Sequence, residues 1–437
     1  MYRETAGLVM YGQLGKDSIL MKLGSLVEKM EHDDSYSREE LVRAIYDEVY
    51  RLLDLSTTYG FDNNLWQCYI AYLLATTENP FSILCETVGA SKDGTVNEIV
   101  KQDMEHFYHL FHYDFSAMEK KLGVACFETL THYHSMAKAE NTYNKSVSEK
   151  VRDLASQLCE AKNGEDFFDI VTAFYKRYGV GKFGLNKAFR VVHTGDEMVL
   201  SPITHTSDVT LDELIGYELQ KKQLVENTEA FVEGRRANNC LLFGDSGTGK
   251  STCIKAILNQ YYEKGLRLIE VYKHQFQDLS AIIETIKNRN YKFIIYMDDL
   301  SFEEFEIEYK YLKAVIEGGL ETKPDNVLIY ATSNRRHLIK ESFDDVKDYK
   351  PELHSSDTVQ EKLSLVARFG VTIYYGAPEK QEYDDIVINL AKKNGIEMDT
   401  DELLLEAGRW ELNHGGRSGR CAQQFIIYLL GQKALKK

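Results

Sequence analysis

The sequence predicts an α/β protein in which a parallel β-sheet with crossover helices follows an all-α region and precedes a small helical lid. Three observations support this fold class. Apolar residues have helical spacing over residues 1–195, short apolar runs alternate with helical segments after residue 211, and only helical spacing remains after residue 378. Alternating strands and helices indicate crossover connections, which produce parallel strands.

The N-terminal region contains a clear amphipathic helix over residues 37–53, where Leu41 and Ile45 recur on one helix face. Ser37 and Glu40 have the spacing of a capping box, which predicts that the helix begins there. We therefore expect the first part of the chain to be helical.

A polar, non-periodic segment over residues 194–210 contains Gly195 and Pro202 and is typical of a linker. It divides the chain into a helical N-terminal domain and a sheet-containing domain that ends in the lid. The expected domains are residues 1–195, 196–376 and 377–437.

Short apolar runs in the second domain are expected to be buried strands. They are residues 240–243, 267–272, 292–297, 327–331 and 371–374. The helices expected in the lid are residues 383–393, 401–411 and 418–430.

Composition limits the possible functions. The net charge of −16 disfavours constitutive nucleic-acid binding, which needs clustered Lys and Arg, although a local basic groove stays possible. Seven widely spaced cysteines form neither a disulfide framework nor a zinc pattern, as expected for reduced thiols. We expect a cytoplasmic protein without a membrane-spanning segment, because no stretch of about 18 apolar residues occurs.

A phosphate-binding loop follows the apolar run at residues 240–243, with Gly244, Gly249, Lys250 and Ser251 at the required spacing. Glycines let backbone N–H groups curve around phosphates, the lysine neutralises them, and the serine hydroxyl ligates Mg²⁺. The sequence therefore predicts binding of a nucleoside triphosphate. The residues expected to contact it are Gly244, Asp245, Ser246, Gly247, Thr248, Gly249, Lys250, Ser251 and Thr252.

Two acids, Asp298 and Asp299, directly follow the apolar run at residues 292–297. A buried parallel strand delivers such carboxylates to the sheet edge that also carries the phosphate-binding loop. We expect Asp298 and Ser251 to hold Mg²⁺, and Asp299 to orient or deprotonate the attacking water.

Small polar residues end the run over residues 327–334. We expect Asn334 to contact the water and the γ-phosphate. The alternative is that Asn334 only caps a helix before residues 335–337.

The order of these elements resembles that of the AAA+ ATPases over residues 211–430. The amino-acid sequence at residues 298–303, 312–321 and 331–338 is similar to that of one bacterial family. This family is catalogued only as AAA+ ATPases with a domain of unknown function. This resemblance implies an AAA+ P-loop NTPase core, ATP and Mg²⁺ as ligands, and ATP hydrolysis. It implies no biological process.

Further roles follow only from the resemblance. The segment 211–217 looks like the part of AAA+ proteins that packs on adenine, so Ile215 and Gly216 are expected to touch the base. Asn334 corresponds to the first sensor of these ATPases.

Arginines complete the resemblance. Residues 365–370 are similar to a motif that carries an arginine finger, so Arg368 is expected to reach the γ-phosphate of a neighbouring subunit. Arg420 resembles the second sensor, although Arg417 could take that role. Arg368 could instead form a surface ion pair, and Arg420 could pair with a carboxylate at a helix start. The resemblance thus implies a homo-oligomer with shared sites.

Two departures from the AAA+ pattern stand out. The second acid is Asp299, where most AAA+ ATPases have Glu, so hydrolysis is expected to be slow or assisted by Glu303 or Glu304. Residues 273–277 lack the loop with which threading unfoldases grip polypeptide. Phe276 is the one candidate for such a grip, but an aromatic residue in this position is more often a core or surface residue.

The sequence as a whole predicts an ATPase that couples hydrolysis to the remodelling or loading of an unknown protein partner through residues 1–195. Two alternatives remain at this stage. One is an ATP-binding switch or adaptor with little intrinsic hydrolysis, and the other is a nucleic-acid remodeller, which the net charge disfavours.

Overall fold

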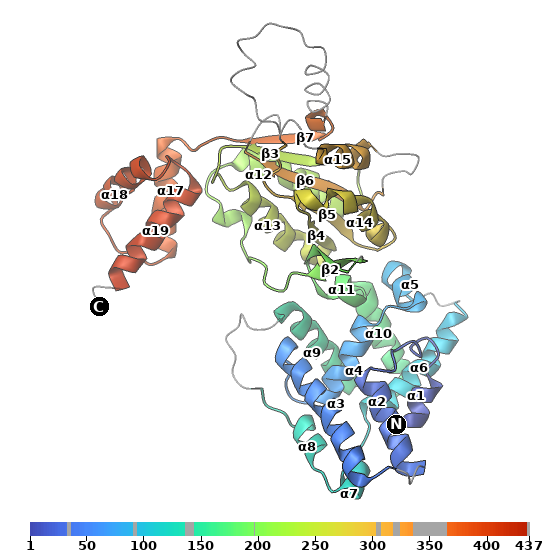
Figure 1. The fold of residues 1–437 in the computed structure, drawn as a ribbon. Helices are drawn as coiled ribbons and strands as arrows, with labels where there is room; N and C mark the ends of the chain where they lie inside the picture. The colour runs from blue at the N-terminus through green and yellow to red at the C-terminus, as the bar shows by residue number, and fades with distance from the viewer. Residues whose placement is uncertain are drawn as a thin grey trace. The chain divides into compact units, whose positions relative to one another are not determined.

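The computed structural model of the chain describes residues 1–32, 36–90, 94–135, 144–195, 197–302, 307–317, 324–334 and 365–434. The chain forms two compact units (Figure 1). The first comprises Met1–Asn186 with Pro202–His205, and the second comprises Lys187–Ser201 with Thr206–Lys437.

The first unit is built of helices in the part that the structure describes. A capping box between Ser37 and Glu40 begins α3, which confirms the predicted helix start. The helices are α1 (Tyr2–Gly7), α2 (Ile19–His32), α3 (Arg38–Tyr59), α4 (Leu65–Thr76), α5 (Pro80–Val88), α6 (Val96–Phe111), α7 (Ser116–Leu122), α8 (Cys126–Thr131), α9 (Lys145–Cys159), α10 (Gly164–Tyr178) and α11 (Gly181–Leu185).

Helix α4 lies at the centre of this unit, where it packs against α3, α6, α8 and α9. Its side chains are apolar on nearly all faces, as expected for a helix surrounded by others. The buried Trp66 donates its Nε1–H to the carbonyl of Leu110 at 2.7 Å, which satisfies its polar atom within the core.

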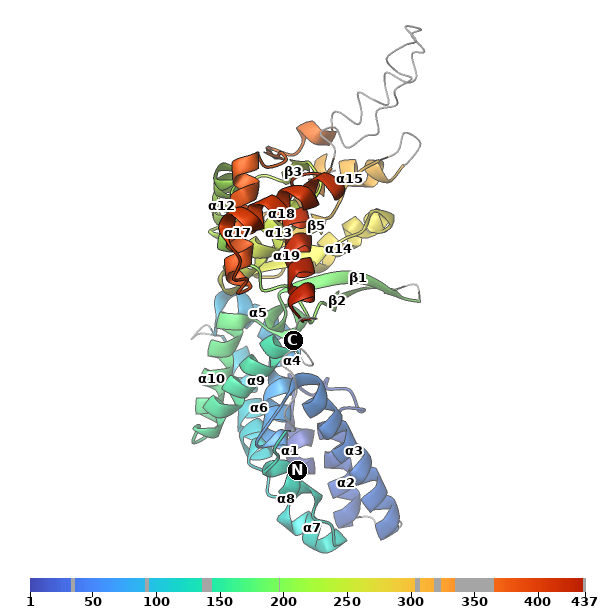
Figure 2. The ribbon, with the colours of Figure 1, turned by 90° about the vertical axis from the view of Figure 1, so that its left-hand side faces the viewer.

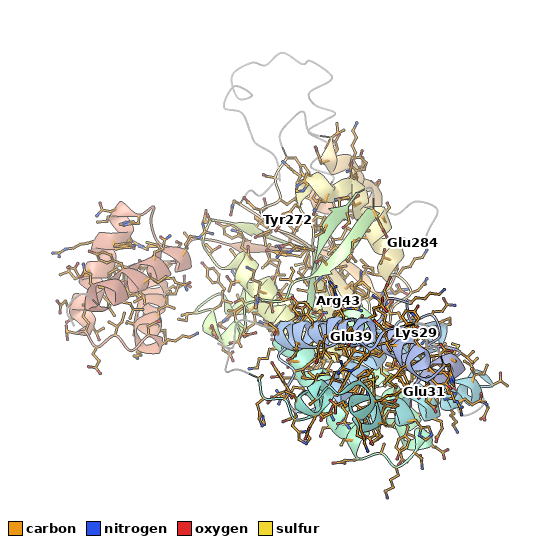
Figure 3. The ribbon with its side chains drawn as sticks, turned by 60° about the horizontal axis from the view of Figure 1, so that its bottom comes forward. Lys29, Glu31, Glu39, Arg43, Tyr272 and Glu284 are labelled. Atoms are coloured by element: carbon orange, nitrogen blue, oxygen red, sulfur yellow. The ribbon has the colours of Figure 1, made fainter. Side chains whose placement is uncertain are left out.

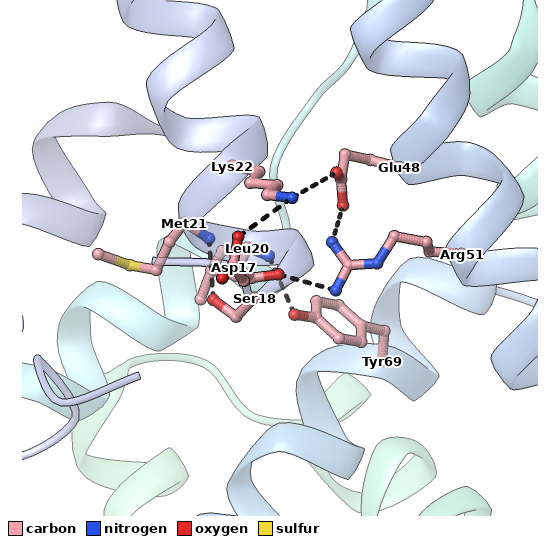
Figure 4. A network of polar contacts seen from close by, with 8 residues as sticks. All are labelled: Asp17, Ser18, Leu20, Met21, Lys22, Glu48, Arg51 and Tyr69. Carbon is pink, nitrogen blue, oxygen red and sulfur yellow. Dashed lines mark hydrogen bonds and ion pairs between the residues drawn. The ribbon is translucent and has the colours of Figure 1, made fainter. Parts of the chain in front are cut away.

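A polar network joins α2 and α3 through the buried carboxylate of Glu48 (Figure 4). Arg51 Nη1 lies 2.5 Å from Glu48 Oε2, and Lys22 Nζ lies 3.9 Å from Oε1. Arg51 also donates to the carbonyl of Asp17 at 2.7 Å. Burial raises the pKa of Glu48 above its usual value, although Arg51 and Lys22 oppose the shift.

This raised pKa makes ionised Glu48 less favourable in the folded than in the unfolded chain. The stability that the protonated Glu48 carboxyl contributes is therefore fully present below about pH 4.5, and it is lost as the pH rises through the pKa of Glu48 in the folded chain. We expect the unfolding free energy of Glu48→Gln, minus that of the natural protein, to increase from about pH 4 to about pH 7. Urea unfolding of both proteins, followed by circular dichroism, measures this difference, and a flat or falling difference would contradict the expectation.

The second unit contains a β-sheet whose described strands have the order β2-β1-β4-β5-β6-β3-β7. Each pair of neighbours from β1 to β7 is parallel. The strands are β1 (Ala188–Thr194), β2 (Glu197–Pro202), β3 (Cys240–Gly244), β4 (Leu266–Glu270), β5 (Lys292–Met297), β6 (Val327–Ser333) and β7 (Val371–Tyr375).

Helices and short 3₁₀ turns connect these strands (Figures 1 and 2). The α-helices are α12 (Glu218–Val232), α13 (Lys250–Tyr261), α14 (Leu279–Ile286) and α15 (Glu308–Glu317), followed by α17 (Lys380–Lys393), α18 (Thr400–Asn413) and α19 (Gly419–Ala434). The 3₁₀ turns are η1 (Leu211–Glu213), η2 (Tyr262–Lys264) and η3 (Lys273–Asp278).

The lid consists of α17, α18 and α19, which pack on one another around their own apolar core (Figure 2). Tyr383, Val387, Ala407 and Phe425 are among its buried residues. The three helices expected here are confirmed, and so are the five expected strands β3 to β7.

Two strands were missed, and one of them, β2, lies in the segment 194–210 that was expected to be a linker. Residues 188–194 were expected to end the helical domain, but they form β1, which pairs in parallel with β4 at Ala188↔Leu268. Phe189 and Val191 are buried there, so the contact with β4 determines the local structure. Strand β1 accordingly belongs to the second compact unit, which begins at Lys187.

The carboxyl ends of β3, β5 and β6 lie at one edge of the sheet. The central strand β6 pairs with both neighbours, at Phe243↔Ser333 and at Met297↔Ala331. The residues that follow each of these strands are therefore adjacent in space.

Candidate functional site

The loop between β3 and α13 is shaped by glycines. Gly244 has a φ of +134°, and a Cβ there would collide with the carbonyl of Tyr375 on β7. Gly249 has a φ of +92°, and a Cβ there would lie 2.5 Å from a methyl carbon of Leu214. The loop is also joined to β7, because the Asp245 N–H donates to the Tyr375 carbonyl at 2.9 Å. Glycine is therefore needed at both positions.

Lys250, the first residue of α13, is buried and holds this loop together. Its Nζ donates to the carbonyls of Gly244 at 2.9 Å and Asp245 at 2.6 Å, and to Asn334 Oδ1 at 3.0 Å. Burial lowers the pKa of Lys250, an effect that the nearby carboxylates of Asp245, Asp299 and Asp298 oppose. The ammonium group is thus fixed where the loop, β3 and β6 meet.

Asp298 follows β5 and accepts two hydroxyl hydrogen bonds on the same oxygen. Ser251 Oγ donates to Asp298 Oδ1 at 2.7 Å, and Thr332 Oγ1 donates to it at 2.6 Å. Burial alone would raise the pKa of Asp298, but the neighbouring hydroxyl groups of Thr332, Ser251 and Tyr296, with the charge of Lys255, outweigh it, and the pKa lies below its usual value. Asp298 is therefore an ionised carboxylate beside a serine hydroxyl at neutral pH.

Asp299 adopts the left-handed region with a φ of +51°, which is unfavourable for a residue other than glycine. Contacts from β6 hold it there. Its N–H donates to Thr332 Oγ1 at 2.9 Å, and its Oδ1 accepts from Asn334 Nδ2 at 2.7 Å. Asn334 consequently links Asp299 to Lys250, with its oxygen on the ammonium and its nitrogen on the carboxylate.

These side chains open into a cavity of about 1040 Å³. One wall is apolar and includes Leu214, Ile215, Ile386 and Leu390. Ile215 also packs against the lid core, so the wall contains residues from both the segment before α12 and the lid. Gly216 is absent from the described lining, and its φ of +79° instead turns the chain after Ile215.

The lid meets the loop at Arg420. Its N–H donates to the carbonyl of Gly247 at 3.2 Å, and a Cβ on Gly247 would lie 3.0 Å from the Cβ of Arg420. Arg420 lines the cavity. Arg417, the alternative from the sequence, lies 3.2 Å from both carboxylate oxygens of Glu411 and is not among the lining residues in the described part of the chain.

Arg368 lies away from this cavity. It precedes β7, which runs parallel to β3 in the register Cys240↔Val371 and Gly244↔Tyr375. Arg368 is therefore beyond the opposite edge of the sheet from the phosphate-binding loop. Its guanidinium forms an ion pair with Glu317 of α15, which is the surface pairing that the sequence left open.

Thr332 was missed by sequence reasoning, although it contacts both acids. A signal existed, because Thr332 belongs to the small polar cluster at the end of β6 from which only Asn334 was chosen. Phe276 is buried at 1% exposure and packs near Phe302, so it is a core residue; the exposed aromatic after β4 is Tyr272 (Figure 3). Glu303, Glu304 and residues 335–337 lie outside the described residues.

Two features are absent from the described residues. No group of three or more His, Cys, Asp or Glu side chains in them is arranged to hold a metal ion. No helix among them is both long enough and apolar enough to cross a membrane.

A family model described as "Protein of unknown function (DUF815)" matches residues 185–433. No curated protein sequence matches the chain significantly. Among solved structures, the RuvB Holliday junction branch migration motor of Thermotoga maritima is similar at a TM-score of 0.37 and 16% identity, over 52% of this chain and 65% of that chain. The FIGL-1 AAA domain in complex with ADP is similar at a TM-score of 0.36 and 18% identity, over 51% and 73%. The match thus spans less than two thirds of the RuvB chain.

Thr332 gives a test of how the acids are held. Thr332→Val preserves the shape of the side chain but removes the hydroxyl that accepts from the Asp299 N–H and donates to Asp298. We expect this change to lower the unfolding free energy by about 1–3 kcal/mol. Thr285→Val on the exposed face of α14 is the matched control, with an expected change within about 0.5 kcal/mol. Equal stability of the two variants in urea unfolding would show that Thr332 does not hold the acids.

Proposed function

This chain belongs to the family described as "Protein of unknown function (DUF815)", and we propose that it is a Mg²⁺-dependent AAA+ ATPase that converts ATP to ADP and phosphate. One observation carries the proposal. Lys250, Asp298 and the Asn334–Asp299 pair converge at the ends of three adjacent parallel strands and line one cavity. A cationic group, an ionised acid and a second, separately held acid are the groups that phosphoryl transfer requires.

The triphosphate would bind along the loop from Gly244 to Thr252. Positive-φ glycines shape this loop, and the N-terminus of α13 adds a favourable dipole for an anion. Lys250 would exchange its loop carbonyls for the β- and γ-phosphate oxygens, a stronger interaction because both partners are charged. The apolar wall with Leu214 and Ile215 offers a surface for adenine.

The residues at the Asp298 end fit a magnesium ion. Ser251 and Asp298 present hard oxygen atoms in contact with each other, and both line the cavity. When bound, the ion supplies neutralisation of charge on the phosphate oxygens. The lowered pKa of Asp298 keeps its carboxylate ionised for this role.

Asp299 is the group proposed to orient the attacking water. Asn334 Nδ2 fixes one carboxylate oxygen, which leaves the other free to accept a proton or a hydrogen bond from the water. Because Asn334 also contacts Lys250, displacement of Lys250 toward phosphate would release Asn334 to contact the γ-phosphate. Asn334 thereby connects nucleotide binding to the position of the proposed base.

Arg368 is proposed to act in a neighbouring subunit, because its place beyond the opposite edge of the sheet excludes it from the site of its own chain. A guanidinium supplied in trans stabilises the charge of the transition state. Arg420 is proposed as the second sensor, since it lines the cavity and contacts the loop through Gly247. That contact would transmit changes in the loop to the lid and, in an assembly, to an unknown protein partner of residues 1–195.

The proposed activity is tested by phosphate release from ATP. We expect the natural protein to release phosphate in Mg²⁺ but not in EDTA, and Asp299→Asn to bind ATP with turnover reduced on the order of a hundredfold or more. Asp325→Asn, a change outside the cavity, is the control with unchanged turnover. Release that persists unchanged in Asp299→Asn would overturn the role of Asp299, and binding without release would favour the ATP-binding switch.

The shared site is tested by Arg368→Ala. We expect specific activity of the natural protein to rise with protein concentration, and Arg368→Ala to bind ATP normally while turnover falls on the order of a thousandfold. Arg235→Ala, which removes an exposed arginine paired with Glu233, is the matched control. A concentration-independent rate, unaffected by Arg368→Ala, would show that each subunit works alone.

A further inference from the structure

Tyr296 is a buried polar residue for which the proposed reaction has no role so far. It lies on β5 two residues before Asp298, so both side chains are on the same face of the sheet. Tyr296 is 2% exposed, and its hydroxyl lies beside Ser251, Asp298 and Thr332. Within the described residues this hydroxyl nevertheless has no hydrogen-bond partner.

The neighbouring tyrosine on β6 shows that this is unusual. Tyr330 pairs with Tyr296 in the sheet register and is equally buried. Its hydroxyl is satisfied by Asn227 Nδ2 and by Thr228 Oγ1, each at 2.9 Å. Of this pair of buried tyrosines, only Tyr296 has an unsatisfied hydroxyl, and that hydroxyl lies beside Ser251 and Asp298, the two residues proposed to hold the metal ion.

Asp298, the acid beside this hydroxyl, is already hydrogen-bonded through one of its carboxylate oxygens. Asp298 Oδ1 already accepts from Ser251 and Thr332. Unpaired buried hydroxyls are unfavourable, and those in native proteins usually find a partner in water or a ligand. A magnesium ion keeps several of its water molecules when it binds protein, and each such water needs hydrogen-bond partners.

We propose that the Tyr296 hydroxyl hydrogen-bonds to a water ligand of the Mg²⁺ ion and so positions the hydrated cation beside Ser251 and Asp298. The inference rests on the proposed function, because it requires Mg²⁺ at this end of the cavity. It assigns a role in cation binding to Tyr296, a residue inside β5 that lies two positions before Asp298.

The test compares nucleotide binding with and without the cation. Calorimetry measures the affinity of the natural protein, Tyr296→Phe and Tyr330→Phe for the non-hydrolysable analogue adenylyl imidodiphosphate, in Mg²⁺ and in EDTA. We expect Mg²⁺ to raise the affinity of Tyr296→Phe by a factor on the order of tenfold smaller than for the natural protein. In EDTA, the two proteins should have the same affinity. The nucleotide-free variant should melt at the same temperature as the natural protein or higher, because an unsatisfied group has been removed.

Tyr330→Phe is the matched control. It removes a hydroxyl that is already hydrogen-bonded, so it should lower the melting temperature and leave the gain from Mg²⁺ unchanged. The proposal is overturned if Tyr296→Phe keeps the full gain from Mg²⁺, or if it loses affinity equally in Mg²⁺ and in EDTA, which would indicate a packing role. If the natural protein binds the analogue in neither condition, the proposed function itself fails, and this inference fails with it.

Discussion

The buried ammonium group of Lys250 is the contact on which the candidate site depends. It joins the carbonyls of Gly244 and Asp245 to the side chain of Asn334, and so connects the end of β3 to the end of β6. A buried cation is tolerated only with such partners, because desolvation is expensive. The same contacts make Lys250 available for an anion, since phosphate oxygens can replace the carbonyls without leaving the charge unpaired.

The parallel sheet explains why residues so distant in sequence form one site. Strand β6 lies between β3 and β5, so Asn334 reaches Lys250 on one side, while Thr332 and Asn334 contact the two acids on the other. The left-handed backbone of Asp299 is held by this arrangement. Position on the sheet edge therefore brings these side chains together, and the lid contributes Arg420 to the lining of the cavity.

Strands β3 to β7 and the loop at Gly244–Ser251 were predictable because continuous apolar runs, glycine spacing and terminal acids are local signals. Strand β1 was not, because its structure depends on pairing with β4. The same limit applies to Thr332 and Tyr296, whose importance comes from contacts between strands. No sequence pattern likewise revealed that Arg420 lines the cavity while Arg417 pairs with Glu411.

The central claim is that the loop after β3 and Lys250 bind the phosphates of ATP beside Mg²⁺. Titration calorimetry of Mg·ATP into the natural protein, Lys250→Ala and the surface control Lys264→Ala tests it most directly. The account predicts binding by the natural protein and the control, and an affinity at least about tenfold lower for Lys250→Ala. Equal heats for all three proteins would contradict it.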